Sequence, residues 1–158
     1  MNKHYAISLF SGAGGLDLGI EAAGFTTRLC TDIDDFSCRT LLQNKEKLKC
    51  TGHPFLAEAT IKLANIKEYS TDDILHDAGL KQDEVDLVYG GPPCQAFSVF
   101  GKRQGINDPR GTLLWDYIRV IHDIQPKAFI FENVAGLLTI DNGNVFAMLL
   151  NELSTTID

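Results

Sequence analysis

The sequence predicts an α/β fold, a Rossmann-like parallel sheet with helices on both faces. Short apolar runs typical of buried strands alternate with amphipathic stretches of helical period, which is the pattern of such a sheet. Glycine or polar residues follow several of these runs directly, at the sheet edge where α/β proteins bind ligands. The 158 residues are 44% apolar and 22% charged, which suits one domain spanning residues 1–158.

The elements can be assigned in chain order. Strands are predicted over residues 5–10, 26–31, 85–89 and 127–131, and helices over residues 16–23, 35–45, 112–124 and 145–153. The section 45–72 has mixed polarity and is expected to be a loop with one short helix at 57–65. No repeat or linker interrupts the pattern.

Net charge, cysteine spacing and the lengths of the apolar runs exclude several classes of protein. The net charge of −7 opposes tight binding of DNA by this chain alone, because cationic side chains supply most of the non-specific affinity. The four cysteines have no C-x-x-C spacing, so neither a metal site nor a disulfide framework is expected. With no apolar run long enough for a membrane span and no signal-peptide pattern, a cytoplasmic location is expected.

A glycine-rich turn follows the first strand. Residues 10–15 (FSGAGG) allow a sharp turn and a close approach of a ligand to the main chain. The dinucleotide pattern G-x-G-x-x-G fails because Asp17 replaces the third glycine. This favours S-adenosylmethionine, which has no phosphate, over a dinucleotide; the alternative is a tight turn without a ligand.

An acid ends the second strand. Asp32 lies where nucleotide-binding folds place a carboxylate that accepts hydrogen bonds from ribose hydroxyls, and Ile33 could contact the adenine. The alternative interpretation is that Asp34 or Asp35 caps the next helix, and the two roles are compatible.

Cys94 follows the strand at 85–89 through Gly91 and two prolines. Most single cysteines are small buried side chains, but in the common strand order 3-2-1-4-5 this one would face the same crevice as the glycine turn. Glu132 directly follows the last strand and would lie one strand further along, where partial burial suits a proton donor. A solvated loop acid is the alternative for Glu132.

Four elements resemble, in order, the early motifs of the 5-methylcytosine DNA methyltransferases. They are residues 10–15 (FSGAGG), 32–34 (DID), 92–95 (PPCQ) and 132–134 (ENV). Residues 97–98 (FS) and 101–113, ending in NDPRGTL, also resemble the family's catalytic loop. The resemblance covers residues 5–153 and implies the fold of an S-adenosylmethionine-dependent methyltransferase.

The resemblance implies a covalent mechanism on double-stranded DNA. The Cys94 thiolate attacks carbon 6 of a cytosine flipped out of the helix, and Glu132 binds and protonates ring nitrogen 3. Carbon 5 then takes the methyl group from S-adenosylmethionine. Loss of the proton from carbon 5 and expulsion of Cys94 release the product.

The resemblance also implies the binding residues. Asp32 would hold the ribose, although the family more often has glutamate there, and Asp73 with Ile74 would contact the adenine. The implied cofactor contacts are Phe10, Ser11, Gly12, Ala13, Gly14, Gly15, Asp32, Ile33, Asp73, Ile74, Gly91, Pro93 and Leu113. The implied DNA contacts are Gln95, Ser98, Lys102, Arg103 and Arg110.

The family's later motifs are not found in this sequence. They are a Gln-x-Arg-x-Arg strand, a target-recognition region and a last segment that packs beside the first strand. The C-terminal part of the sheet is therefore expected to be missing, which leaves the strand near Phe129 at an edge. Three interpretations follow: a truncated methyltransferase, one subunit of a split enzyme completed by a complementary chain, or a non-catalytic subunit or remnant that binds S-adenosylmethionine or a partner.

Overall fold

The structure is a computed structural model that describes residues 3–50, 52, 54–93 and 112–154. Its elements are β1 (His4–Leu9), α1 (Gly15–Ala22), β2 (Phe25–Asp32), α2 (Asp35–Leu48), β3 (Thr60–Leu63), α3 (Thr71–Ala78), η1 (Gln82–Glu84), β4 (Val85–Gly90), α4 (Thr112–Ile124), β5 (Ala128–Phe131), η3 (Ala135–Leu138), η4 (Ile140–Gly143) and α5 (Asn144–Ser154).

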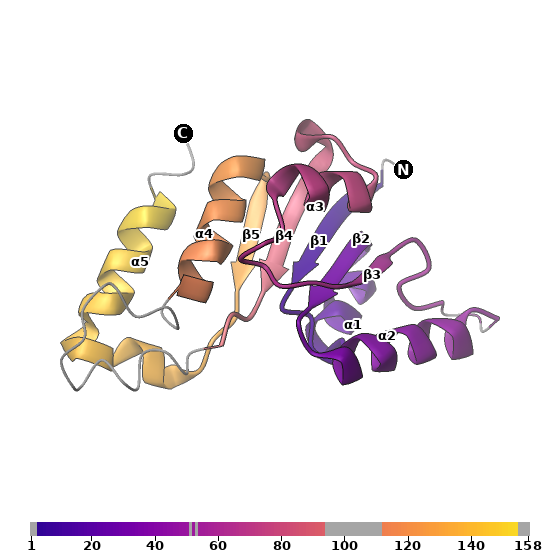
Figure 1. Cartoon of the computed structure of the whole chain (residues 1–158), viewed down its shortest axis with the longest axis horizontal. Coiled ribbons are helices and arrows are strands. Elements are labelled where there is room, and N and C mark those ends of the chain that lie inside the picture. The colour runs from indigo at the N-terminus through magenta and orange to yellow at the C-terminus, as the bar shows by residue number, and fades with distance from the viewer. Residues whose placement is uncertain (1–2, 51, 53, 94–111, 155–158) are drawn as a thin grey trace.

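The strands form one parallel sheet in the order β3-β2-β1-β4-β5 (Figure 1). The predicted fold class and strand order are confirmed. Because β1 pairs with both β2 and β4, the strand order reverses between β1 and β4. Their carboxyl ends lie side by side there, so the segments that follow them begin at the same edge of the sheet.

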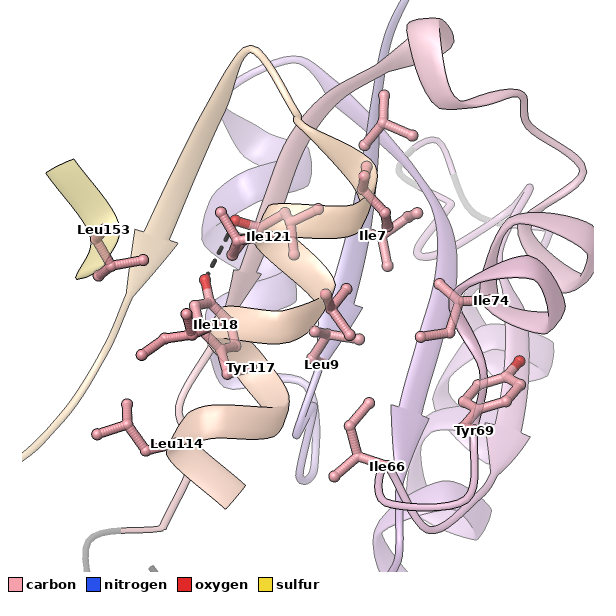
Figure 2. Close-up of a cluster of buried hydrophobic side chains, with 14 of the residues drawn as sticks. Ile7, Leu9, Ile66, Tyr69, Ile74, Leu114, Tyr117, Ile118, Ile121 and Leu153 are labelled. Carbon is pink, nitrogen blue, oxygen red and sulfur yellow. Dashed lines mark hydrogen bonds between the residues drawn. The ribbon is translucent and has the colours of Figure 1, made fainter. Parts of the chain in front are cut away.

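Helices pack on both faces of the sheet because β1 buries alternate residues on opposite faces. Ala6 packs in a cluster with Ile20 of α1, whereas Ile7 and Leu9 belong to the larger core under α3 and α4. Figure 2 shows side chains of β1 and α4 gathered in this larger core. A strand buried on both faces reads as a continuous apolar run, which is how the sequence revealed it.

Helix α4 fixes the position of β5. The hydroxyl of its buried Tyr117 donates a hydrogen bond to the carbonyl of Ile130 at 2.9 Å. The Tyr117 ring also meets the ring of Phe131 edge-on, with centroids 5.6 Å apart. These contacts hold the end of β5, and therefore the start of the segment that carries Glu132, against the core.

Two elements differ from the sequence prediction. The helix expected at 57–65 is wrong, since Thr60–Leu63 forms β3 and pairs with β2 from Leu29 onward. Helix α3 was not predicted, although Ser70 caps its start and Gly79, with a φ of 61°, ends it. Strand β3 was missed because it is short and half-exposed, which leaves only a weak apolar pattern in the sequence.

Replacing Gly90 by alanine is expected to destabilise the fold by about 3 kcal/mol, as overpacking against a rigid neighbour does. A Cβ atom at Gly90 would lie 2.1 Å from the carbonyl oxygen of Leu9, its partner in the parallel register. Urea unfolding of the purified protein measures the effect. The matched control is Gly19→Ala in α1, where a Cβ meets nothing within 4 Å and unfolding should be unchanged or slightly harder. Equal midpoints for both variants would contradict the prediction.

Candidate active site

Two adjoining cavities lie at the carboxyl edge of the sheet. The first, of about 270 Å³, is lined by Phe10, Thr31, Asp32, Ile33, Ala64, Asn65, Ile66, Gly91, Pro93 and Leu113. The second, of about 390 Å³, is lined by Ser8, Leu9, Phe10, Ser11, Leu16, Asp17, Gly90, Gly91 and Glu132. Phe10 and Gly91 belong to both walls, so one elongated ligand could enter both spaces.

The glycine-rich turn after β1 connects this strand to α1, and its first residue, Phe10, lines both cavities. Phe10, Gly12 and Gly14 all have positive φ angles, of 55°, 53° and 91°. A side chain at Gly14 would collide with Leu41, since its Cβ would lie 2.6 Å from a methyl carbon of that residue. The chain thus turns tightly enough to begin α1 at Gly15. Of the predicted residues 10–15, Phe10 and Ser11 line a cavity, whereas residues 12–14 form the turn, Gly15 begins α1, and none of these four lines either cavity.

Asp32 ties the turn to the end of β2. One of its carboxylate oxygens accepts a hydrogen bond from the amide of Gly12 at 2.8 Å, and the other accepts one from the amide of Asp34 at 2.9 Å. The carboxylate is therefore held in place at the wall of the first cavity, and each oxygen has a lone pair left for a ligand hydroxyl. Ile33 stands beside it with 69% of its surface exposed, a free apolar face at the rim.

Asp34 is the cap of α2. Its carboxylate accepts hydrogen bonds from the amide and the hydroxyl of Ser37, at 2.8 and 2.7 Å. These hydrogen bonds lower the pKa of Asp34. The capping role that the sequence allowed for Asp34 is confirmed, and it leaves Asp32 turned toward the cavity.

Residues that sequence reasoning missed complete the first cavity. Ala64, Asn65 and Ile66 directly follow β3, and the amide of Ala64 donates a hydrogen bond to the carbonyl of Asp32 at 2.9 Å. Because residues 57–65 were predicted to be a helix, the end of β3 was not recognised as a third strand end at the carboxyl edge of the sheet. The available signal was the alternation of polar and apolar residues over Thr60–Leu63, with the polar Asn65 two residues after the strand.

Asp73 and Ile74 line neither cavity. Asp73 lies in the first turn of α3, where its amide and its carboxylate both bond to the hydroxyl of Ser70. Ile74 is fully buried in the core. The structure therefore does not bring these two residues to either cavity, because they form the start and the buried face of a helix. Asn65 and Ile66 line the first cavity instead.

Glu132 lines the second cavity. The partial burial expected for it from the sequence is wrong, because Glu132 is exposed where it follows β5. Its amide donates to the carbonyl of Gly90 at 2.9 Å, which continues the pairing of β5 with β4 by one residue. A Cβ at Gly91 would lie 2.6 Å from a carboxylate oxygen of Glu132, so a larger residue there would displace the end of the Glu132 side chain. The side-chain amide of Asn133 donates to the carbonyl of Pro92 at 2.8 Å and joins the two strand ends.

Pro93 and Leu113 line the first cavity from either side of a segment outside the described residues. That segment contains the predicted nucleophile Cys94 and the predicted DNA contacts Gln95, Ser98, Lys102, Arg103 and Arg110. These assignments stay predictions.

The charges that line the cavities are all negative. Asp32 lines the first, Asp17 and Glu132 line the second, and no lysine, arginine or histidine lines either among the residues described. Such walls repel phosphates and attract cations. In the described part of the chain, no three histidine, cysteine or acidic side chains are grouped to hold a metal ion, and no helix has the length and apolarity to cross a membrane.

Replacing Asp32 by alanine is expected to weaken S-adenosylhomocysteine binding by about 1–3 kcal/mol, because it removes the predicted acceptor of the ribose hydroxyls and the observed anchor of the glycine turn. Asp32→Asn keeps the size and an acceptor oxygen and should lose less. Calorimetric titration of both variants measures the dissociation constants. An unchanged constant for Asp32→Ala would reject the assignment.

Comparison with known proteins identifies the family. The family model of the C-5 cytosine-specific DNA methylases matches residues 5–156. The type II methyltransferase M.AquIA of Picosynechococcus sp. is 40% identical over 151 residues, which are 96% of this chain and 56% of the relative. M.Sau96I of Staphylococcus aureus is 39% identical over 152 residues, 94% of this chain and 31% of the relative. The chain thus spans from about a third to just over half of these relatives.

Solved structures of methyltransferases also match most of this chain. A crystal structure described as a putative DNA modification methyltransferase encoded within an E. coli prophage is 26% identical, with a TM-score of 0.73 over 97% of this chain and 38% of the other. The S. pombe Dnmt2 methyltransferase, 18% identical with a TM-score of 0.56, shares the fold over 95% of this chain and 40% of the other. Since the family match runs from β1 through α5, the chain belongs to the C-5 cytosine-specific DNA methylase family.

Proposed function

We propose that this chain binds S-adenosylmethionine and carries the nucleophile and the general acid for methylation of carbon 5 of cytosine in double-stranded DNA. The observation that carries the proposal is the pair of joined cavities, with Asp32 at the wall of one and Glu132 at the wall of the other. The ends of β1 and β4, where strand order reverses, form their shared wall.

The cavity walls fit the cofactor. The first cavity combines apolar side chains with one anchored carboxylate, which suits an adenine and a ribose. Asn65 and Ile66 are proposed to contact the adenine, in place of Asp73 and Ile74. The acidic second cavity suits a ligand with a cationic sulfonium and an ammonium group better than one with phosphates. When bound, S-adenosylmethionine supplies the methyl group that is transferred.

The residues of this chain then have separate roles. Cys94 forms the bond to carbon 6 of the flipped cytosine, and Glu132 donates its proton to ring nitrogen 3, so that negative charge does not build up on the ring. Glu132 can reach a base in the second cavity because Gly91 leaves room beside its carboxylate. Lys102, Arg103 and Arg110 are proposed to meet DNA phosphates.

Further DNA-binding surface is proposed to come from residues outside this sequence. The relatives are longer than this chain, and its net charge of −7 disfavours DNA binding by this part alone. The remaining surface would be in the same polypeptide or in a complementary subunit. The type II methyltransferases among the relatives suggest a place in restriction–modification.

A trapping experiment tests the proposal. DNA that carries 5-fluorocytosine at the target position is incubated with the complete protein that contains this chain and S-adenosylmethionine. Because fluorine cannot leave as the proton does, the adduct should survive denaturing electrophoresis and map to Cys94. Omitting the cofactor should prevent the trap. Activity on ordinary DNA together with an adduct on another residue would reject Cys94 as the nucleophile.

A further inference from the structure

The segment 64–70 joins β3 to α3 and forms part of the wall of the first cavity. It belongs to no helix or strand, and three of its residues, Ala64, Asn65 and Ile66, line the cavity. Ile66 and Tyr69 are also buried in the large core, together with side chains of α4 (Figure 2). The carbonyls of such a loop need hydrogen-bond partners, because a buried carbonyl without one is unfavourable.

Arg119 of α4 supplies these partners. Its Nη2 atom donates a hydrogen bond to the carbonyl of Ile66 at 2.9 Å and one to the carbonyl of Tyr69 at 3.2 Å. Its Nη1 atom donates to the hydroxyl of Thr71, the first residue of α3, at 3.3 Å. One planar guanidinium group therefore binds the main chain on both sides of the turn at residues 66–68 and the start of the next helix.

Two acids of the same helix balance the charge of Arg119 without accepting its hydrogen bonds. Its Nε atom lies 3.8 Å from a carboxylate oxygen of Asp116, and its Nη1 atom lies 3.8 Å from one of Asp123. Both distances exceed that of a hydrogen bond. Asp123 instead accepts a hydrogen bond from the hydroxyl of Thr71 at 2.6 Å. The directional contacts of the guanidinium group are thus made to the segment 64–70 and to Thr71.

Helix α4 contributes to the same cavity directly. Leu113, in the first turn of α4, lines the first cavity together with Asn65 and Ile66. Because Arg119 holds the segment 64–70 against α4, it also sets how the parts of the wall that come from Leu113 and Ile66 lie relative to each other. Arg119 itself lines neither of the two cavities, so its effect on a ligand there must pass through the segment.

We propose that Arg119 is a positioning residue for the cofactor site, which holds the segment 64–70 in its cavity-lining shape before the cofactor binds. The inference rests on the proposed function and adds to it a residue that does not touch the cofactor. Without the guanidinium group the segment would adopt several conformations. The apparent dissociation constant of the cofactor would then rise in inverse proportion to the fraction of molecules that keep the binding shape.

Hydrogen exchange of main-chain amides tests the positioning without any ligand. The reporters are the amides of Ala64 and Glu68, which are both hydrogen-bonded, and the reference is the set of amides in β1 and β4. In Arg119→Ala, the ratio of the exchange rate in the segment to that in the reference strands should rise about 10-fold. An unchanged ratio would mean that Arg119 only stabilises the fold, and it would overturn the inference.

Calorimetry and steady-state kinetics on the complete protein that contains this chain test the consequence for the cofactor. S-adenosylhomocysteine should bind about 10-fold more weakly to Arg119→Ala. The KM for S-adenosylmethionine should rise by a similar factor, while kcat at saturating cofactor changes by less than about 2-fold. Arg119→Lys should recover only part of the affinity, because an ammonium group on a flexible stem does not reproduce the planar fork of donors.

Arg39→Ala on α2 is the matched control. Arg39 pairs with Asp35 of its own helix at 2.7 Å and lines neither cavity. The substitution should change neither the exchange of the segment 64–70 nor the affinity. Should Arg119→Ala fail to fold, Arg119→Lys takes its place in both measurements, with smaller factors in the same direction.

The outcomes separate this inference from the proposed function. Faster exchange of the segment 64–70 with unchanged affinity for S-adenosylhomocysteine would overturn the inference, and the cofactor site would stand. A fall in kcat with an unchanged KM would overturn it as well, since Arg119 would then act on another step. Failure of the unchanged protein to bind S-adenosylhomocysteine would overturn the proposed function itself.

Discussion

Replacing Cys94 by serine is expected to reduce methyl transfer on the order of 10⁴-fold or more while leaving S-adenosylhomocysteine binding unchanged. A serine hydroxyl stays protonated at neutral pH and is a far weaker nucleophile than a thiolate, so the bond to carbon 6 would not form at a useful rate. The cavity proposed for the cofactor is lined by other side chains, among them Phe10 and Asp32, and binding there should be unaffected. Transfer of radiolabelled methyl groups to DNA, measured with the complete protein, gives the rate.

The chain supplies a matched control for this substitution. Cys50→Ser changes the same atoms at an exposed position beyond α2 that lines neither cavity. It should keep full activity, as well as the ability to form the adduct with fluorinated DNA. Comparable rates for Cys94→Ser and Cys50→Ser would remove Cys94 from the mechanism.

Replacing Glu132 by glutamine is expected to lower kcat by about 10²- to 10⁴-fold, the usual contribution of a positioned proton donor. Glutamine has the same shape and can still bond to the base, but it has no acidic proton to donate. Because the main chain of Glu132 is held by Gly90, the substitution should leave the fold and cofactor affinity in place. Single-turnover kinetics on duplex DNA separates this loss from an effect on DNA binding.

Glu46→Gln on α2 is the corresponding control, since Glu46 is exposed and pairs only loosely with Lys49 at 3.9 Å. Its kcat should equal that of the unchanged protein. If Glu132→Gln were equally active, the proton would have to come from another group, and Glu132 would be a structural residue of the cavity wall.

The sheet could be predicted from the sequence because its central strands are apolar on both faces. β1 and β4 are almost continuous apolar runs, and each is followed by a glycine-containing segment. Both the strands and the positions where they end can therefore be recognised in the sequence. The positions of Phe10, Asp32 and Glu132 at one edge follow from that, since parallel strands end on the same side.

The wall of the first cavity that follows β3 could not be predicted with the same reasoning. β3 is a four-residue strand with no fully buried position, so its pattern resembles that of a loop. Without that strand end, an acid further along the chain is the better candidate for the adenine contact, yet Asp73 belongs to the start of α3. The contacts of Arg119 are equally invisible in a sequence, because they depend on which main-chain carbonyls its guanidinium group reaches.

The hydrogen bond from Asn133 to the carbonyl of Pro92 has a consequence for the energetics of the reaction. It joins the segment that carries Glu132, the proposed proton donor, to the strand end that leads toward Cys94, the proposed nucleophile. With the proposed roles, a hydrogen bond that belongs to the fold would supply part of the free energy needed to bring these two segments together, and DNA binding would not have to provide that part. An enzyme with this arrangement can direct its DNA-binding energy to extracting the base from the stack.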